Sequence, residues 1–286
     1  MTEQLIFVPD QRRQIILDLL RSTRERIMLS LFRCDDSPVL DEIVATAKRK
    51  VDVQVLVTPR ARGWNRRLGG LVTLLKATGV DVKQYHGPWT KYHAKYIIVD
   101  GRTAAVCTAN LTRKCFERTC DFVWLSEDPD LVSSLTQLFE FDMNTPDLEP
   151  PVLSRQLIIG PEQSRERMSA FVGRARKDLR IIDHKVTHPD LLLSIGQRIQ
   201  AGVRVRILGR DEVGGLVSHG KLMIVDDELA IIGSASLSRP GLDIRREVSV
   251  VIQDRARVAE LTELFDRLAA STVLVPAVLD EDEDEE

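Results

Sequence analysis

The sequence predicts an α/β fold in which two similar α/β/α units are related by a pseudo-two-fold axis and hold one site between them. The first observation is that the pattern His-x-Lys-x-x-x-x-Asp occurs at 93–100 and again at 219–226. The second is that the segments 4–7 and 156–159, which precede the two patterns, also resemble each other. The third is that short apolar strands alternate with amphipathic helices in both halves. Together they indicate duplication of a structural unit.

The register of the duplication sets the expected domain boundaries. Counterparts stay 126 positions apart from the two motifs as far as Asp121 and Glu247, whereas the upstream segments stand 152 positions apart. The first half therefore contains 26 extra residues before its motif. We predict a first unit at 1–146, a second unit at 147–272 and an acidic, disordered tail at 273–286, with a proline-rich linker at 144–151.

The elements of the first half follow from hydrophobic periodicity. Ile15, Ile16, Leu19 and Leu20 share one face of a helix, and the alternation at 51–57 is typical of a strand. The β-α-β-α-β order at the start of the chain is typical of a parallel sheet flanked by helices. We expect strands at 5–8, 26–32, 51–57 and 122–125, and helices over 10–23, 39–50 and 130–143.

The two halves differ by the extra segment. In the first half this segment is expected to add a helix over 68–77, which Gly79 closes, and a strand at 80–85. The second half repeats the remaining order, with helices expected over 161–177, 188–201 and 255–269 and strands at 179–183, 203–208, 229–232 and 248–252.

The motif strand of each half is expected to form a tight hairpin. Asp100-Gly101 is a dipeptide typical of such a turn, so the strand at 96–99 should return as 103–107. Residues two positions apart share one face of a strand, so the His and Lys of each motif should project together. The Asp falls at the turn on the opposite parity. We therefore interpret Asp100 and Asp226 as structural residues.

Composition excludes several classes of protein. No apolar run approaches the roughly 20 residues of a membrane span, and the start of the chain lacks a secretion signal, so we expect a cytoplasmic protein. The four cysteines have neither metal-ligand nor disulfide-framework spacing, so we expect no metal and no cofactor. The net charge is −3, and because the seven acids at 280–286 belong to the tail, the rest of the chain carries +4.

The repeated side chains suit phosphoryl transfer without a metal. If the two-fold axis brings His93 and His219 to opposite sides of one phosphorus, one imidazole can attack it while the other protonates the leaving oxygen. Lys95 and Lys221 would stabilise the charge that gathers on the non-bridging oxygens. The two motifs therefore predict a catalytic set of four residues.

Four further residues are expected to support this set. Asn110 and Ser236 follow the two motifs at the same spacing and would assist the lysines at the non-bridging oxygens. Asp121 and Glu247 are suited to accept the second imidazole N–H, which orients the ring and supports the imidazolium.

The motifs resemble the signature of the phospholipase D superfamily, which is His-x-Lys-x-x-x-x-Asp followed by Gly-Ser-x-Asn, usually present twice. The resemblance covers about 4–270 of the chain. It implies a paired α/β fold, phosphodiester hydrolysis or transfer through a phosphohistidine, and no metal requirement. It also implies that His93 is the nucleophile and that His219 is the general acid and base.

The sequence departs from that signature after both motifs. The segment 107–110 reads Cys-Thr-Ala-Asn and the segment 233–236 reads Gly-Ser-Ala-Ser, so hydroxyl groups are kept but one Asn is replaced by Ser. We expect a working site with a less effective phosphate cradle. The residues expected to bind phosphate are Thr108, Asn110, Ser234 and Ser236.

Three functional hypotheses stay open on the sequence. The first is a lipid enzyme related to cardiolipin synthases and phospholipases D, with a phospholipid substrate and peripheral contact at the inner face of an anionic membrane. The second is a nuclease or nucleic-acid phosphodiesterase, and the third is a binding module without activity, against which both intact His-Lys pairs argue. The sequence leaves open the choice between hydrolysis and transfer, and the oligomeric state.

Loop residues favour the lipid hypothesis over the nuclease. Aromatic residues make up only 5% of the chain, which is little for stacking on single strands. Trp64 lies among Arg60, Arg62, Arg66 and Arg67, a mixture that suits an anionic lipid interface. The alternative is that Trp64 packs against the helix over 68–77 and that the arginines are solvated loop charges.

One further His-Lys pair imitates the motifs. His184 is followed by Lys185, with Asp190 six positions after the His, but a Lys at the next position would face the opposite side of a strand. We interpret this pair as a chance match.

Overall fold

The computed structural model describes residues 3–87, 91–144 and 152–272. The predicted acidic tail at 273–286 lies outside these ranges, as do the predicted boundary after residue 146 and all but the first residue of the predicted linker. Among the described residues, none of the helices combines the length and the hydrophobicity that a bilayer-spanning segment needs.

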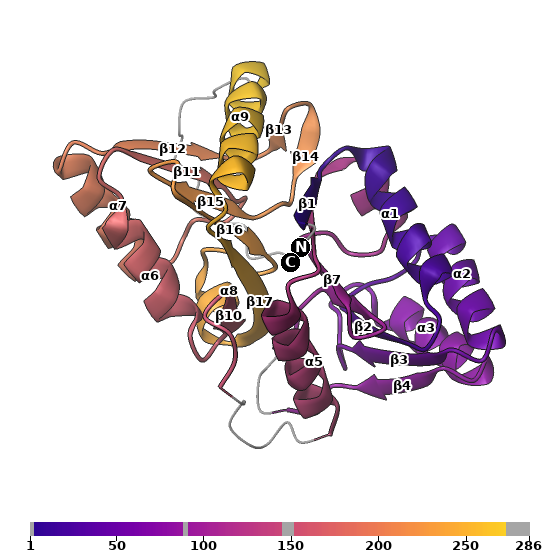
Figure 1. Cartoon of the computed structure of the whole chain (residues 1–286). Helices are drawn as coiled ribbons and strands as arrows, with labels where there is room; N and C mark the ends of the chain where they lie inside the picture. Colours follow the sequence, from indigo (N-terminus) through magenta and orange to yellow (C-terminus); the bar gives the residue numbers. More distant parts are fainter. Residues whose placement is uncertain (1–2, 88–90, 145–151, 273–286) are drawn as a thin grey trace.

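The first half folds into a seven-stranded mixed sheet in the order β1-β9-β7-β6-β2-β3-β4 (Figure 1). The predicted parallel pairing is confined to β2, β3 and β4. The hairpin at the motif reverses the chain, so β6 pairs antiparallel with β2, and β1 pairs antiparallel with β9 at the far edge. The strands are β1 (Glu3–Ile6), β2 (Arg26–Leu31), β3 (Asp52–Val57), β4 (Asp81–Gln84), β6 (Tyr96–Val99), β7 (Thr103–Cys107) and β9 (Val123–Ser126).

The second half repeats this sheet in the order β10-β17-β16-β15-β11-β12. Each of these strands is the counterpart of one in the first sheet, and only β4 has no counterpart among the described strands. The predicted fold class of two similar α/β units is confirmed. The strands are β10 (Leu157–Gly160), β11 (Asp178–Ile182), β12 (Arg204–Leu208), β15 (Leu222–Val225), β16 (Leu229–Gly233) and β17 (Arg245–Ile252).

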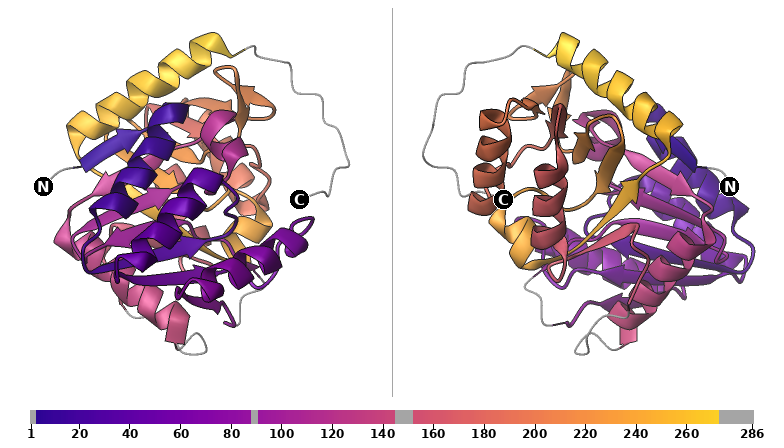
Figure 2. Two further views of the ribbon diagram at one scale, coloured as in Figure 1. Left: turned by 90° about the vertical axis from the view of Figure 1, so that its right-hand side faces the viewer. Right: turned by 60° about the vertical axis from the view of Figure 1, so that its left-hand side comes forward.

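The helices form layers on both sides of each sheet (Figures 1 and 2). Helices α1 to α3 cover the outer face of the first sheet, and α6 and α7 cover the outer face of the second. Helices α5 and α9 pack between the sheets in one apolar core to which both halves contribute. The bounds are α1 (Pro9–Ser22), α2 (Ser37–Lys48), α3 (Asn65–Ala77), α4 (Arg113–Glu117), α5 (Pro129–Asn144), α6 (Ser164–Arg174), α7 (Pro189–Gln200), α8 (Arg239–Asp243) and α9 (Arg255–Ser271).

Local sequence explains where several helices begin. Pro9 and Pro189 occupy the first turns of α1 and α7, where a missing N–H costs nothing and the fixed φ suits a helix. Asp254 caps α9 by accepting a hydrogen bond from the backbone N–H of Arg257. These residues determine where the helices begin. The apolar face of each helix determines which sheet surface it covers.

The extra segment of the first half covers a sheet edge. Its β4 pairs in parallel with β3, whereas β12, the counterpart of β3, is the edge of the second sheet. Trp64, directly before α3, is only 7% exposed and packs in the same apolar core as Val57 and Leu68. The prediction that Trp64 anchors the protein at a lipid interface is therefore wrong, because the segment folds back and buries the indole.

Two short parallel pairings join the halves, and neither is evident from the sequence. Strand β5 (Lys91–Tyr92) pairs with β17, and β14 (Leu216–Ser218) pairs with β8 (Thr119–Cys120) and with β13 (Glu212–Val213). In register, Lys91 faces Arg245 and Val217 faces Thr119, and the counterparts in the two pairings again stand 126 positions apart. Each pairing sets the start of one motif beside the strand that leads to the acid of the other half.

Candidate active site

The motif residues lie where the chain enters the central hairpin of each sheet. His93 and Lys95 directly precede β6, and His219 and Lys221 directly precede β15. The backbone N–H of His93 donates to the carbonyl of Arg246 across the two halves at 2.9 Å. These segments are therefore held by backbone contacts with the opposite half, which fixes where the imidazoles point.

A glycine makes the matching contact possible in the second half. The backbone N–H of Gly220 donates to the carbonyl of Cys120 at 2.6 Å. A Cβ at Gly220 would lie 2.6 Å from that carbonyl oxygen and 2.6 Å from the ring of Phe122. Glycine is required here because any side chain would push the motif away from the first half.

Each histidine is hydrogen-bonded to a carboxylate from the other half. His93 Nδ1 lies 2.8 and 3.0 Å from the two carboxylate oxygens of Glu247. His219 Nδ1 lies 2.8 Å from Asp121 Oδ1. A carboxylate at Nδ1 favours the tautomer with the proton on that nitrogen, so Nε2 carries the lone pair in each ring.

The two carboxylates differ in their surroundings. Burial alone would raise the pKa of Asp121, but the charge and hydrogen bond of His219 and the Arg12 guanidinium hold it below its ordinary value. The Arg12 guanidinium is buried, 3.8 Å from Asp121 Oδ2. Burial raises the pKa of Glu247, and Lys95 only partly offsets this effect. We call each motif histidine with its acid a half-site, the first being His93 with Glu247 and the second His219 with Asp121. The second half-site therefore contains the more firmly ionised acid.

Thr108 and Ser234 hydrogen-bond to the chain segments that carry the two carboxylates. Both are completely buried, and neither lines the cleft described below. Thr108 Oγ1 donates to Asp121 Oδ1 at 2.5 Å, and Ser234 Oγ accepts from the backbone N–H of Val248 at 3.0 Å. The geometry differs in this respect from the prediction that both bind phosphate, because β7 and β16 turn these hydroxyls inward.

Five of the predicted residues, His93, Asn110, His219, Lys221 and Ser236, meet at one cleft of about 570 Å³. Asn110 and Ser236 line it from equivalent positions in the two halves. Its cationic side chains are Arg33, Arg62, Lys91, Lys185, Lys221 and Arg245, and among the described residues that line it none is acidic. A chamber of this kind suits a phosphoryl group, whose charge it would neutralise.

Lys95 lies behind the cleft against the first histidine. Its Nζ is 3.2 Å from both ring nitrogens of His93 and donates to the His93 carbonyl at 2.7 Å. Burial lowers the pKa of Lys95 to about 7, although Glu247 acts in the opposite direction. Burial and the charge of Lys95 lower the pKa of His93 well below its ordinary value. At neutral pH His93 is therefore an uncharged imidazole.

His219 is also mainly neutral in the free protein. Burial lowers its pKa, whereas the charge of Asp121 raises it and that of Lys221 lowers it. The balance differs from that at His93 because a firmly ionised carboxylate faces the ring. An anionic substrate in the cleft would add a second negative charge beside His219 and favour its protonation.

Asp100 and Asp226 lie away from this cleft. The Asp100 carboxylate accepts backbone N–H groups of residues 24–26, and that of Asp226 accepts those of residues 176–178. Both residues have positive φ, 50° and 53°, which suits a tight turn. These contacts tie each hairpin turn to the loop that leads into β2 or β11.

The structure adds cleft residues that the motifs do not reveal. Phe32 and His184 stand 152 positions apart, one residue after β2 and two residues after β11, and each lies beside a motif histidine. The rings of Phe32 and His93 are 4.6 Å apart with an edge-on geometry, and those of His184 and His219 are 6.3 Å apart and nearly parallel. The offset between the halves could have identified this pair.

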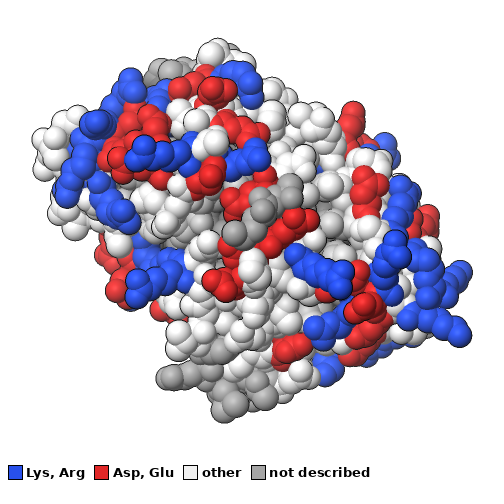
Figure 3. Space-filling view, in the orientation of Figure 1, with Lys and Arg blue, Asp and Glu red and all other residues white. Residues whose placement is uncertain are grey.

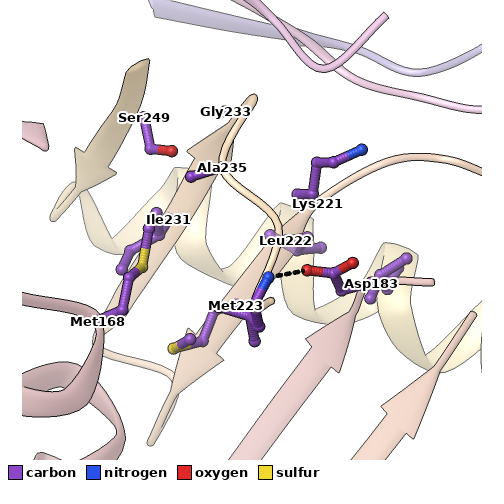
Figure 4. A pocket seen from close by; sticks show the side chains of 11 residues that line it. Met168, Asp183, Lys221, Leu222, Met223, Ile231, Gly233, Ala235 and Ser249 are labelled. Carbon is purple, nitrogen blue, oxygen red and sulfur yellow. Dashed lines mark hydrogen bonds between the residues drawn. The ribbon is translucent and has the colours of Figure 1, made fainter. Parts of the chain in front are cut away.

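A second chamber of about 650 Å³ adjoins the first. Four residues line both, namely Arg33, Asn110, His184 and His219. His93 lines the first chamber alone, so the two motif histidines have different access to the second. A separate apolar cavity behind Lys221 measures only about 20 Å³, which is enough for a water and too small for a substrate (Figure 4).

One group of side chains has the composition of a metal site. Ligand atoms of Cys115, Asp121 and His219 lie within 4.8 Å of one another. The Asp121 oxygens already accept hydrogen bonds from Thr108, Thr119 and His219, and burial raises the pKa of Cys115. The donors do not fit a bound cation, because a thiolate is disfavoured and the carboxylate is occupied. The absence of a metal requirement stays a prediction.

Comparison with protein families supports the architecture. The family model described as "Cardiolipin synthase, PLD-like domain" matches residues 16–143 and 158–269, one match in each half. No curated protein sequence matches the chain.

Solved structures share the fold at low sequence identity. A polyphosphate kinase from Porphyromonas gingivalis matches with a TM-score of 0.76 and 18% identity, over 93% of this chain and 46% of the kinase, so the chain spans about half of its length. A phosphatidylserine synthase from Haemophilus influenzae Rd KW20 matches with a TM-score of 0.74 and 13% identity, over 93% of this chain and 86% of the other. These likenesses show the fold alone.

Proposed function

Because the chain belongs to the cardiolipin synthase, phospholipase D-like domain family of the phospholipase D superfamily, we propose that it hydrolyses or transfers a phosphodiester through a phosphohistidine, without a metal. The observation that carries the proposal is that His93 and His219 meet at one cation-lined cleft, each on a carboxylate from the opposite half. Two such rings supply a nucleophile and a general acid, which an in-line displacement at phosphorus needs.

The reaction takes two balanced steps. In the first, the Nε2 lone pair of His93 attacks phosphorus, the bond to the leaving oxygen breaks, and protonated His219 gives that oxygen its proton. In the second, His219 takes a proton from water or an alcohol, whose oxygen attacks phosphorus while the bond to His93 breaks. Lys221, which lines the cleft, neutralises the non-bridging oxygens in both steps, and Lys95 adds its positive charge from beside His93.

The assignment of roles follows from the two carboxylates. His93 has its pKa held well below the ordinary value and faces Glu247, whose own pKa is raised, so an uncharged nucleophile is favoured there. Asp121 stays ionised beside Arg12 and can balance an imidazolium on His219. A neutral nucleophile and a ring that alternates between two protonation states are what the two steps need.

The substrate we propose is a phospholipid head group. The family description supports this choice. Phe32 and Pro240 are the apolar residues among those that line the first chamber, so acyl chains would remain outside while the phosphodiester enters. The face in Figure 3 carries interspersed basic and acidic side chains, without the broad positive area that binds a nucleic-acid backbone.

A nucleic-acid phosphodiester is the second candidate. The first chamber contains six cationic side chains and, among the described residues that line it, no acid, which suits a polyanion. Burial of Trp64 also removes the residue that favoured a lipid interface on the sequence alone.

The decisive experiment offers both substrates to the purified protein in excess EDTA. Vesicles of mixed phospholipids and labelled single-stranded DNA are incubated in parallel, with the His93→Ala variant as the matched control. We expect conversion of phospholipid to phosphatidic acid or to an exchanged phospholipid, intact DNA, and no conversion by the variant.

Two results would change the proposal. Cleaved DNA with unchanged lipid would replace the phospholipid by the second candidate. Activity that requires a divalent ion after chelation would contradict the mechanism itself.

A further inference from the structure

We propose that His184 positions the hydroxyl group that leaves and enters at phosphorus, and that the second chamber binds the neutral, hydroxyl-bearing group to which it belongs. The inference rests on the proposed function and names a residue and a subsite of that same site. It starts from an asymmetry, since the position equivalent to His184 in the first half is Phe32.

His184 occupies the junction of the two chambers. It lines both of them, and its ring lies nearly parallel to that of His219, with an interplanar angle of 11°. His93 lines only the first chamber. The group that His219 protonates and deprotonates therefore lies on the side of His184, and the phosphoryl group that His93 retains lies on the other.

The Nδ1 atom of His184 lies beside a carboxylate. This atom is buried, has no hydrogen-bond partner among the described residues and lies 3.5 Å from Asp183 Oδ1. Asp183 is fixed in turn, because its oxygens accept backbone N–H groups of Lys185 at 2.9 Å and Leu237 at 2.6 Å, the latter drawn in Figure 4. The nearby carboxylate favours the proton on Nδ1, so Nε2 is left as an acceptor on the cleft side.

His184 also remains uncharged across the working range of pH. Burial and the charge of Lys221 lower the pKa of His184 to about 3. The side chain is 22% exposed, so a substrate hydroxyl can reach the ring. A neutral acceptor can take a hydrogen bond from the second hydrogen of water, or from a second hydroxyl of a polyol, and leave the reacting proton to His219.

The charges of the two chambers differ in a way that selects the bound groups. The second chamber contains three acidic side chains, from Asp35, Asp211 and Glu212, beside five basic ones, whereas the first contains six basic side chains and, among its described lining residues, no acid. Arg67 is engaged by Asp35 at 3.1 Å. A second phosphate would meet these carboxylates, whereas a polyol could hydrogen-bond to both kinds of side chain. The first chamber therefore takes the anion, and the second takes a neutral hydroxyl compound.

The corresponding step balances without another reagent. Water donates one hydrogen to His184 Nε2 and gives the other to His219 Nε2 while its oxygen forms the new bond to phosphorus. A polyol donates to His184 Nε2 through a hydroxyl beside the one that reacts, and the reacting hydroxyl gives its proton to His219. The bond between phosphorus and His93 breaks and its electron pair returns to the imidazole. His184 neither gains nor loses a proton.

The test uses bis(4-nitrophenyl) phosphate, whose good leaving group needs little protonation in the first step. Release of the first 4-nitrophenol reports attack by His93, and steady-state release reports breakdown of the phosphohistidine. We expect His184→Phe, which copies the first half, to keep the initial burst within about twofold and to slow the steady state about tenfold. His184→Gln keeps an acceptor and should recover most of the loss.

A matched control separates position from general damage. Lys185→Gln changes the neighbouring residue, which lines the first chamber only, so it should raise KM and leave the ratio of burst to steady-state rate unchanged. Equal loss of both phases in His184→Phe, or no loss in either, would overturn the role of His184. A wild-type protein that releases no 4-nitrophenol would instead overturn the proposed function.

The subsite is tested by competition between acceptors. Glycerol and glycerol 3-phosphate are offered at equal concentration during turnover of the same substrate, and the transfer products are counted. We expect glycerol to be used at least about tenfold more often, with the preference reduced in Glu212→Gln. Equal or greater use of glycerol 3-phosphate by the wild type would overturn the assignment of the second chamber.

Discussion

The two half-sites share one backbone plan and differ in a few side chains. In both, a histidine precedes the central hairpin and contacts an acid from the opposite sheet. The first half-site has Glu247 with a raised pKa, whereas the second has Asp121 with a lowered one. Duplication thus provides the symmetric framework, and differences between equivalent side chains of the two halves give the two histidines different chemical roles.

The difference can be traced beyond the acids themselves. Arg12 on α1 is fully buried beside Asp121, and its counterpart 152 positions later is Ser164, which carries no charge. The partners of the rings differ likewise, with Phe32 at His93 and His184 at His219. The comparison shows that the second half-site is built to hold and exchange a proton, and the first to stay neutral.

The largest effect is expected when either ring is removed. His93→Ala and His219→Ala should each lower kcat by several orders of magnitude, because the two rings act in one displacement. The double variant should be little worse than either single one. Steady-state kinetics of all three variants checks this, and multiplicative losses in the double variant would show that the half-sites work independently.

The two acids should differ when their charge is removed without change of shape. We expect Asp121→Asn to lower kcat about 10³-fold, because a carboxylate supports the imidazolium of His219. Glu247→Gln should cost only about tenfold, since His93 enters the reaction as a neutral ring that needs no proton. Comparable losses in the two variants, measured with one phosphodiester, would contradict the division of roles.

Arg12 should matter for stability more than its distance from the cleft indicates. Arg12→Met leaves Asp121 and the carbonyl of Thr119 without their buried partner, since the guanidinium donates to that carbonyl at 2.8 Å. We expect a loss of about 3 kcal/mol in the free energy of unfolding. Urea unfolding measures it, with the exposed Arg66→Met as control, and equal midpoints for the two variants would refute this account.

The smallest expected effect concerns pH. Lys95 must carry its proton to neutralise phosphate, and its pKa is about 7, so kcat/KM should fall roughly tenfold per unit as pH rises above 7. It should keep rising as pH falls below 7, because His219, whose pKa is also lowered, then takes up the proton that the first step needs. Lys95→Arg should make the alkaline fall shallower. A level profile up to pH 9 in the wild type would contradict the assignment.

Much of the fold could be predicted because hydrophobic periodicity and the repeat agreed. The hairpin strands β6 and β7 lie at the predicted residues, since Asp100-Gly101 specifies the turn. The two-residue strands β5 and β8 could not be predicted, because pairing between halves leaves no periodic signal. Burial of Trp64 likewise depends on how the extra segment folds back.

The site residues that repeat in both halves could be predicted. The contacts that each histidine makes with the opposite half could not. The motif histidines and lysines could be identified from their spacing alone. The exchange of acids between halves depends on β5 and β14, whose pairing exists only in three dimensions. His184 and Lys185 are interpreted as a chance match from the sequence because neighbours on a strand face opposite sides, but both residues follow the end of β11 and both line the cleft.

The most direct test of the central claim is to trap the covalent intermediate. The His219→Ala variant lacks the base for the second step, so bis(4-nitrophenyl) phosphate should leave a 4-nitrophenyl phosphoryl group on the protein. Mass spectrometry of its peptides should locate that group on His93. A modified Lys95, or no modification while the wild type turns over, would contradict the account, as would a group found on His219 in the converse His93→Ala variant.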